Sequence, residues 1–119
     1  MVTRAKKDAD RLSPLETARR IALLCEEKQA TDVAILDMRG VCDYTDFFVI
    51  ATGQNTRQTK AMHDEVLGVV KVEQRLVPRS VAGLPEATWI LADYLDIVLH
   101  ITSSGESFGY GIEESSPLK

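Results

Sequence analysis

The chain has 119 residues, 45% of them apolar and 27% charged, which fits one globular domain with a single core. Two cysteines exclude a disulfide framework, and no export leader or bilayer-spanning apolar run is recognisable, so a cytoplasmic location with free thiols is expected. Residues 1–20 hold six basic and three acidic side chains, which leaves 8 basic and 15 acidic ones in the rest. An acidic domain repels phosphate, so its surface is expected to bind a basic protein rather than nucleic acid.

Residues 1–12 are predicted to form a disordered, charged arm. Such an arm either contacts RNA or is a solvated terminus, and the solvated terminus is favoured because a short charged terminus is more often of this kind. A helix is expected to follow, because Ser13 can cap it, Pro14 suits its first turn and Glu16 completes a capping box. Apolar residues recur on this helix at spacings of three and four, at Leu15, Ala18, Ile21, Ala22 and Cys25.

Two strands and a second helix are predicted next, at residues 33–38, 47–52 and about 57–75. The second strand is apolar throughout, so it is expected to be central in a sheet. Gly53 either lets a phosphate approach the following helix N-terminus or meets the need for a small residue in a tight turn, and the turn is favoured. The inner side of the second helix is predicted to hold Ala61, Met62, Val66, Val69, Val70 and Glu73.

The last three predicted strands are 77–81, 88–93 and 97–101, and Pro78 indicates that the first is an edge strand. The other two are apolar runs joined by a short acidic turn. That pattern predicts an antiparallel hairpin at the heart of a sheet, covered on both faces. The fold class is therefore α/β, with a mixed sheet of about five strands and two main helices packed on it. The domain is expected to span residues 13–102, with a weakly ordered C-terminal tail at 103–119.

Metal chemistry is one interpretation of five aspartates near strand ends, namely Asp37, Asp43, Asp46, Asp93 and Asp96. Carboxylates that converge at one edge of a sheet can hold Mg²⁺, and a Mg²⁺-dependent nucleotidyltransferase would use Asp37, Asp46 or Asp93. Arg57 and Lys60 are the nearest candidates for binding its phosphates. Aspartates are also common at strand ends because they favour turns, and that interpretation is preferred. No catalytic residue, metal ligand or cofactor is therefore assigned.

The histidines and cysteines show no catalytic or zinc-binding pattern. His100 lies within an apolar strand and is expected to be a hydrogen-bonded core residue, whereas His63 is expected to be solvated. Cys25 is predicted to lie in the core and Cys42 in an exposed turn.

Trp89, the only Trp in the chain, is the strongest candidate for a binding residue. It begins a strand next to a loop, and Tyr94 lies in the following turn between Asp93 and Asp96. A rigid aromatic side chain surrounded by acids is typical of an interaction hot spot. The alternative is that Trp89 is a core residue, and the residues alone leave both interpretations open.

Six stretches carry a resemblance to a known family: DVAILDMRG at 32–40, TDFFVIATG at 45–53, RQTKAM at 57–62, AG at 82–83, WILADY at 89–94 and DIVLHI at 96–101. In this order they resemble the ribosomal silencing factor family, also called Iojap-related. The resemblance covers about residues 15–101.

The resemblance implies a nucleotidyltransferase-like α/β fold without known catalysis. Members bind the large ribosomal subunit through its fourteenth ribosomal protein and block joining of the small subunit, so translation falls when nutrients are scarce. They are commonly homodimers when free. On this basis Trp89 and Tyr94 are expected to be desolvated partner contacts, and direct contact with RNA stays open. Steering of a basic partner is expected from Asp43, Asp46, Asp93 and Asp96.

The chain departs from the family pattern at three places. Leu95 stands where the family has Gly in the hairpin turn, and because a positive φ disfavours Leu, a turn of another type is expected. Ala82 replaces the usual acid before Gly83. The C-terminal stretch lacks the family's Arg, its paired aromatics and its Leu-Glu followed by Trp, which leaves open what the tail contributes to binding and dimerisation.

Overall fold

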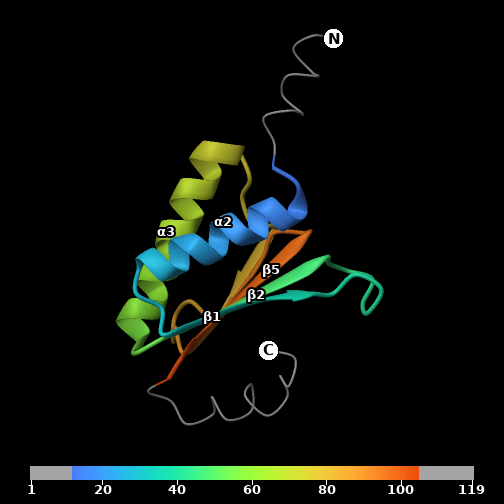
Figure 1. The fold of residues 1–119 in the computed structure, drawn as a ribbon. Helices are drawn as coiled ribbons and strands as arrows, with labels where there is room; N and C mark the ends of the chain where they lie inside the picture. Colours follow the sequence, from blue (N-terminus) through green and yellow to red (C-terminus); the bar gives the residue numbers. More distant parts are fainter. Residues whose placement is uncertain (1–11, 105–119) are drawn as a thin grey trace.

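A computed structural model describes residues 12–104 of the chain (Figure 1). The predicted N-terminal arm, apart from Leu12, and the predicted C-terminal tail, apart from residues 103 and 104, lie outside the described residues. The two predicted helices and five predicted strands are present. In chain order they are α2 (Pro14–Glu27), β1 (Asp32–Asp37), β2 (Phe47–Gly53), α3 (Thr56–Gln74), β3 (Ser80–Ala82), β4 (Trp89–Asp93) and β5 (Ile97–Ser103).

Helix α2 begins as its sequence predicts. The Glu16 amide donates to Ser13 Oγ at 3.2 Å, and the Ser13 amide donates to Glu16 Oε1 at 3.0 Å, so the capping box is complete. These two bonds satisfy amides that would otherwise lack a partner in the first turn. The predicted apolar face is confirmed, because Ala18, Ile21, Ala22 and Cys25 are buried and Leu15 packs against them.

The five strands form one mixed sheet in the order β1-β2-β5-β4-β3. Strands β2 and β5 pair in parallel, and the three other neighbouring pairs are antiparallel, including the predicted β4–β5 hairpin. The last strand of the described residues is thus the middle of the sheet. Strand β3 is an edge strand as predicted, but it begins at Ser80, beyond Pro78. Proline has no amide to donate to a neighbouring strand, which favours this late start.

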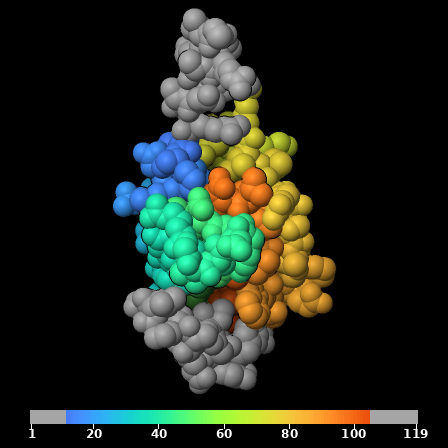
Figure 2. Space-filling view, turned by 90° about the vertical axis from the view of Figure 1, so that its right-hand side faces the viewer, coloured from blue at the N-terminus to red at the C-terminus, as the bar shows by residue number. Residues whose placement is uncertain are grey.

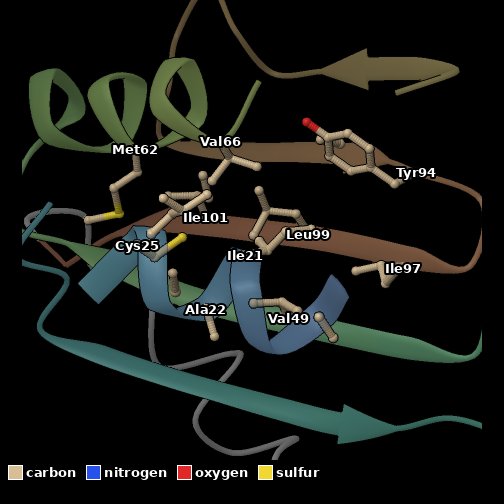
Figure 3. Close-up of a cluster of buried hydrophobic side chains, with 14 of the residues drawn as sticks. Ile21, Ala22, Cys25, Val49, Met62, Val66, Tyr94, Ile97, Leu99 and Ile101 are labelled. Carbon is tan, nitrogen blue, oxygen red and sulfur yellow. The ribbon is translucent and has the colours of Figure 1, made fainter. Parts of the chain in front are cut away.

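Both helices pack on the same face of the sheet (Figure 1). In Figure 3, Ile21 of α2 and Met62 and Val66 of α3 point towards Val49 of β2 and Leu99 of β5. All five side chains are fully or almost fully buried. The core therefore lies between the helices and one face of the sheet. The sequence predicts that both faces of the central strands are covered. Within residues 12–104, helices cover only one face.

The buried side of α3 is broader than the sequence suggests, because α3 packs against α2 as well as the sheet. Thr17 Oγ1 of α2 donates to Gln74 Oε1 at 2.9 Å, and this hydrogen bond is buried. Glu73 is exposed and forms an ion pair with Arg20 of α2, with 2.7 Å between Arg20 Nη2 and Glu73 Oε2. The prediction that His63 is solvated is wrong, because it is buried on the same broad face.

Leu99 is expected to be critical for stability, because it is fully buried in the central strand. Leu99→Ala should lower the free energy of unfolding by about 2–5 kcal/mol through lost apolar burial and the cavity left behind. Chemical denaturation measures this change. Leu23→Ala removes the same atoms from an exposed site on α2 and should change stability by less than about 0.5 kcal/mol. Equal losses for the two variants would contradict the described core.

Candidate functional site

The face of the sheet that points away from α2 and α3, here called the open face, has no described helix over it. Successive side chains of a strand point to opposite faces, so the residues between the core positions lie on this face. Most of them are apolar and only half-buried. They include Ala34, Leu36, Phe48, Ile50, Trp89, Leu91, Val98 and His100.

Four rings form a continuous line across the open face, here called the aromatic row. The ring centroids of Trp89 and His100 are 6.4 Å apart, those of His100 and Phe48 4.7 Å, and those of Phe48 and Tyr44 6.4 Å. These separations lie in the range in which aromatic rings attract one another. The row runs from the start of β4 across β5 and β2 to the loop before β2. Trp89 is 46% exposed and Tyr44 60% exposed, so both ends are available to a partner.

Trp89 is held in place by the loop before it. The loop turns at Gly83, which has φ +87, and a Cβ there would lie 2.0 Å from the carbonyl oxygen of Trp89, so only glycine fits. The Ala87 amide donates to the Gly83 carbonyl oxygen at 2.7 Å. Thr59 Oγ1 of α3 then donates to the Ala87 carbonyl oxygen at 2.6 Å. The start of β4, and with it Trp89, is thereby fixed to a helix of the core.

The four aspartates that are expected to steer a partner lie at the end of the sheet opposite Trp89. They lie in or beside two segments that we call the tip: residues 38–46 and the turn at 94–96 (Figure 2). The Asp46 and Phe47 amides both donate to the Asp96 carbonyl oxygen, at 2.9 and 3.0 Å, and this joins the two segments. Asp43 and Asp96 are exposed and Asp46 is half-buried. Along β4 the main chain rises about 13 Å from Trp89 to Asp93, and the aromatic row runs diagonally between these two ends of the sheet.

Asp93 differs from the other three acids because its contacts are internal. Its Oδ2 accepts from Arg79 Nε at 3.0 Å, and its Oδ1 accepts from the Leu95 amide at 2.8 Å. Asp93 therefore shapes the turn between β4 and β5, and its charge is already paired.

Two sequence predictions at this turn are wrong. Tyr94 is only 2% exposed, so it is a core residue rather than a surface contact, and burial raises the pKa of its phenol to about 12. Leu95 does adopt a positive φ, of 81°. The Asp96 amide donates to the Tyr94 carbonyl oxygen two residues back, at 3.0 Å, which is the hydrogen bond of a γ-turn. A non-glycine residue in such a conformation costs about 1–3 kcal/mol.

The nucleotidyltransferase interpretation gains no support from the geometry. Asp37 and Asp93 lie on β1 and β4, which are separated by two strands or about 14 Å. Arg39 donates twice to Asp37 and lowers the pKa of that carboxyl to about 2. Arg57 and Lys60 are at the start of α3, beyond the far end of β2 from these acids. Within residues 12–104, no group of three or more His, Cys, Asp or Glu side chains is placed to hold a metal ion.

Gly53 has a packing role. A Cβ there would lie 3.1 Å from both Met62 Cε and Thr59 Cγ2, so the close approach of β2 to α3 favours glycine. The first turn of α3 is capped by its own side chains, since the Gln58 amide donates to Asn55 Oδ1 at 2.9 Å. Cys25 is confirmed as a core residue, and burial raises the pKa of its thiol to about 12. Cys42 is only half-buried.

Comparison with known proteins identifies the family. The model of the family described as "Ribosomal silencing factor during starvation" matches residues 11–114. The chain belongs to the ribosomal silencing factor family. It is 31% identical to the ribosomal silencing factor RsfS of Bacillus subtilis over 93 residues, which are 78% of each chain. It is 28% identical to mouse mitochondrial assembly of ribosomal large subunit protein 1, over 81% of this chain and 43% of that one.

The fold is that of solved structures as well. A crystal structure of a protein from Chromobacterium violaceum superposes with a TM-score of 0.79, at 24% identity, over 87% of this chain and 86% of that one. The α/β class predicted for this silencing factor is therefore confirmed. None of the helices in the described residues is long and apolar enough to cross a membrane.

Sequence reasoning placed Trp89 and the aspartates on the surface of this silencing factor but missed the rings between them. The prediction that His100 is a hydrogen-bonded core residue is wrong, because His100 is half-buried on the open face. Its Nε2 is buried and has no hydrogen-bond partner among the described residues. The sequence predicts Phe48 only as part of the apolar strand at 47–52 and gives Tyr44 no role. Tyr44 and Phe48 are four residues apart, and an even spacing in extended chain places side chains on the same face. This spacing was the signal in the sequence that could have linked the two rings.

The two histidines of this silencing factor should make its stability depend on pH. Burial lowers the pKa of both His63 and His100 below the ordinary value of 6.5. The unfolded chain therefore binds more protons than the folded one as the pH falls through about 6.5, and stability is lost there. Urea denaturation at pH 7.5 and 5.5 should show a lower free energy of unfolding at the lower pH. His63→Gln should reduce this difference, and a difference unchanged in both His63→Gln and His100→Gln would contradict the assignment.

Proposed function

We propose that this chain represses translation by binding the large ribosomal subunit, through its fourteenth ribosomal protein, and by sterically blocking the small subunit. The observation that carries the proposal is the aromatic row on the open face. A partner can cover a rigid, apolar and partly exposed surface of this kind with little loss of side-chain freedom. The action is steric and uses no catalysis, and it takes place in the cytoplasm.

Family membership and charge support the choice of partner. The described surface at the tip carries Asp43 and Asp96, whereas ribosomal proteins are generally basic because they bind RNA. A mouse relative bears the name of a large-subunit assembly protein, which associates the fold with that subunit. Self-association of the free chain through the same open face is part of the proposal, and it would compete with ribosome binding.

Sedimentation of the purified protein with isolated large and small subunits tests the proposal directly. The protein should co-sediment with the large subunit and not with the small one. Addition of the protein before the subunits are mixed should reduce the fraction of joined ribosomes. If the protein binds neither subunit, the proposed binding is wrong. If it binds the large subunit without reducing the fraction of joined ribosomes, the proposed steric block is wrong.

Trp89 is expected to be the principal anchor. Trp89→Ala should weaken large-subunit binding by more than about 1 kcal/mol, because truncation of an aromatic hot-spot contact typically costs at least this much. The thermal unfolding midpoint should change little, since Trp89 is 46% exposed. Val72→Ala provides the control, because Val72 is an exposed apolar residue on α3, outside the open face. Subunit binding that survives Trp89→Ala unchanged would exclude Trp89 as the anchor.

Asp43 and Asp96 are expected to act on the rate of association. The double variant Asp43→Asn and Asp96→Asn removes two exposed charges at the tip. It should slow association several-fold at low salt, because rim charges steer encounter more than they hold the complex. The difference from the unmodified protein should shrink as salt is raised, since salt screens exposed charges. Association kinetics on immobilised large subunits measure both effects, and a rate independent of these charges would contradict steering by the tip.

A further inference from the structure

Leu95 has a strained backbone conformation, and its side chain gains little stabilising burial within the described fold. It has φ +81 in a turn of the kind that glycine usually fills. The side chain is 51% exposed, so burial in the core offsets only part of the backbone strain. Strained residues that a fold does not need for its own packing cluster at functional sites.

Leu95 is part of a larger apolar surface at the tip. Val41 is 72% exposed and Tyr44 60% exposed on the 38–46 loop. The hydrogen bonds from the Asp46 and Phe47 amides to the Asp96 carbonyl oxygen hold this loop against the turn that carries Leu95. Figure 2 shows the loop, in teal to green, beside the orange residues that follow β4. The tip therefore presents exposed apolar side chains from two segments that are tied together.

The charges around this surface indicate what it contacts. Asp43 and Asp96 border the apolar side chains and form no ion pair within residues 12–104. A surface with these acids at its rim repels RNA phosphates, and it attracts lysine and arginine. Tyr44 is also the last ring of the aromatic row, so the tip continues the open face.

We propose that Leu95, with Val41 and Tyr44, inserts into an apolar recess bordered by basic side chains on the protein partner, and that Leu95 helps to determine which partner binds. This inference rests on the proposed function, because it assigns a second contact region to the same complex. Trp89 anchors one end of the surface and the tip engages the other. The strained backbone is then offset in the complex, where the leucine is buried.

Leu95→Gly provides a sharp test, because it removes the side chain and relieves the backbone strain together. The variant should bind isolated large subunits at least fivefold more weakly, while its thermal unfolding midpoint stays equal or rises. Leu95→Met retains a flexible apolar side chain and should bind within twofold of the unmodified protein. Leu95→Asn, which tolerates a positive φ but is polar, should behave as Leu95→Gly does. Val72→Ala serves again as the exposed apolar control.

The possible outcomes separate this inference from the proposed function. If Trp89→Ala weakens binding but Leu95→Gly binds within twofold, the tip assignment is wrong and the proposed function stands. If the unmodified protein does not bind large subunits, both are wrong. Sedimentation equilibrium of the Leu95→Gly variant alone tests whether the tip contacts a second copy of the chain. If the variant loses a homodimer but binds large subunits as the unmodified protein does, the tip serves self-association and the inference is overturned.

Discussion

Strand β5 is buried or half-buried along its whole length, but the two described helices cover only one of its faces. On that side Leu99 and Ile101 are sealed beneath α2 and α3. On the other side, Val98 and His100 lie between neighbouring strands, and no helix within residues 12–104 covers them. The open face exposes apolar side chains to water, which is unfavourable. Burial of this face against another molecule removes the unfavourable contact. The aromatic row and the position of Trp89 both follow from this one-sided packing.

The two ends of the open face are built differently. At the Trp89 end, a glycine that no other residue could replace and a buried threonine hydroxyl hold the main chain to α3. At the tip, main-chain hydrogen bonds to the Asp96 carbonyl oxygen join a loop to a strained turn. One end is thus fixed by the core and the other by contacts within the surface itself. A binding surface with both ends fixed loses little conformational freedom when a partner arrives.

Local patterns predicted most of the fold. The capping box at Ser13 and Glu16, the apolar face of α2 and the acidic turn between two apolar runs are short-range signals, and each produced the expected element. The strand order was not predictable, because the pairing of β2 with β5 joins residues about fifty apart in the chain. The same limit explains the errors at the site. A run of apolar residues cannot reveal which face a helix covers, so His100 was placed in the core, and Tyr94 could not be distinguished from a surface aromatic.

The middle of the sheet is supplied by the last strand of the described chain, and this has a consequence for biogenesis. Strands β1 and β2 can pair as soon as both are synthesised, but β2 gains its second neighbour only when β5 emerges. Until then the apolar side chains destined for the core have no complete sheet to pack on, and the nascent chain depends on late, long-range closure to fold. A protein whose family is defined by silencing ribosomes thus cannot complete the middle of its own sheet until β5 has been synthesised.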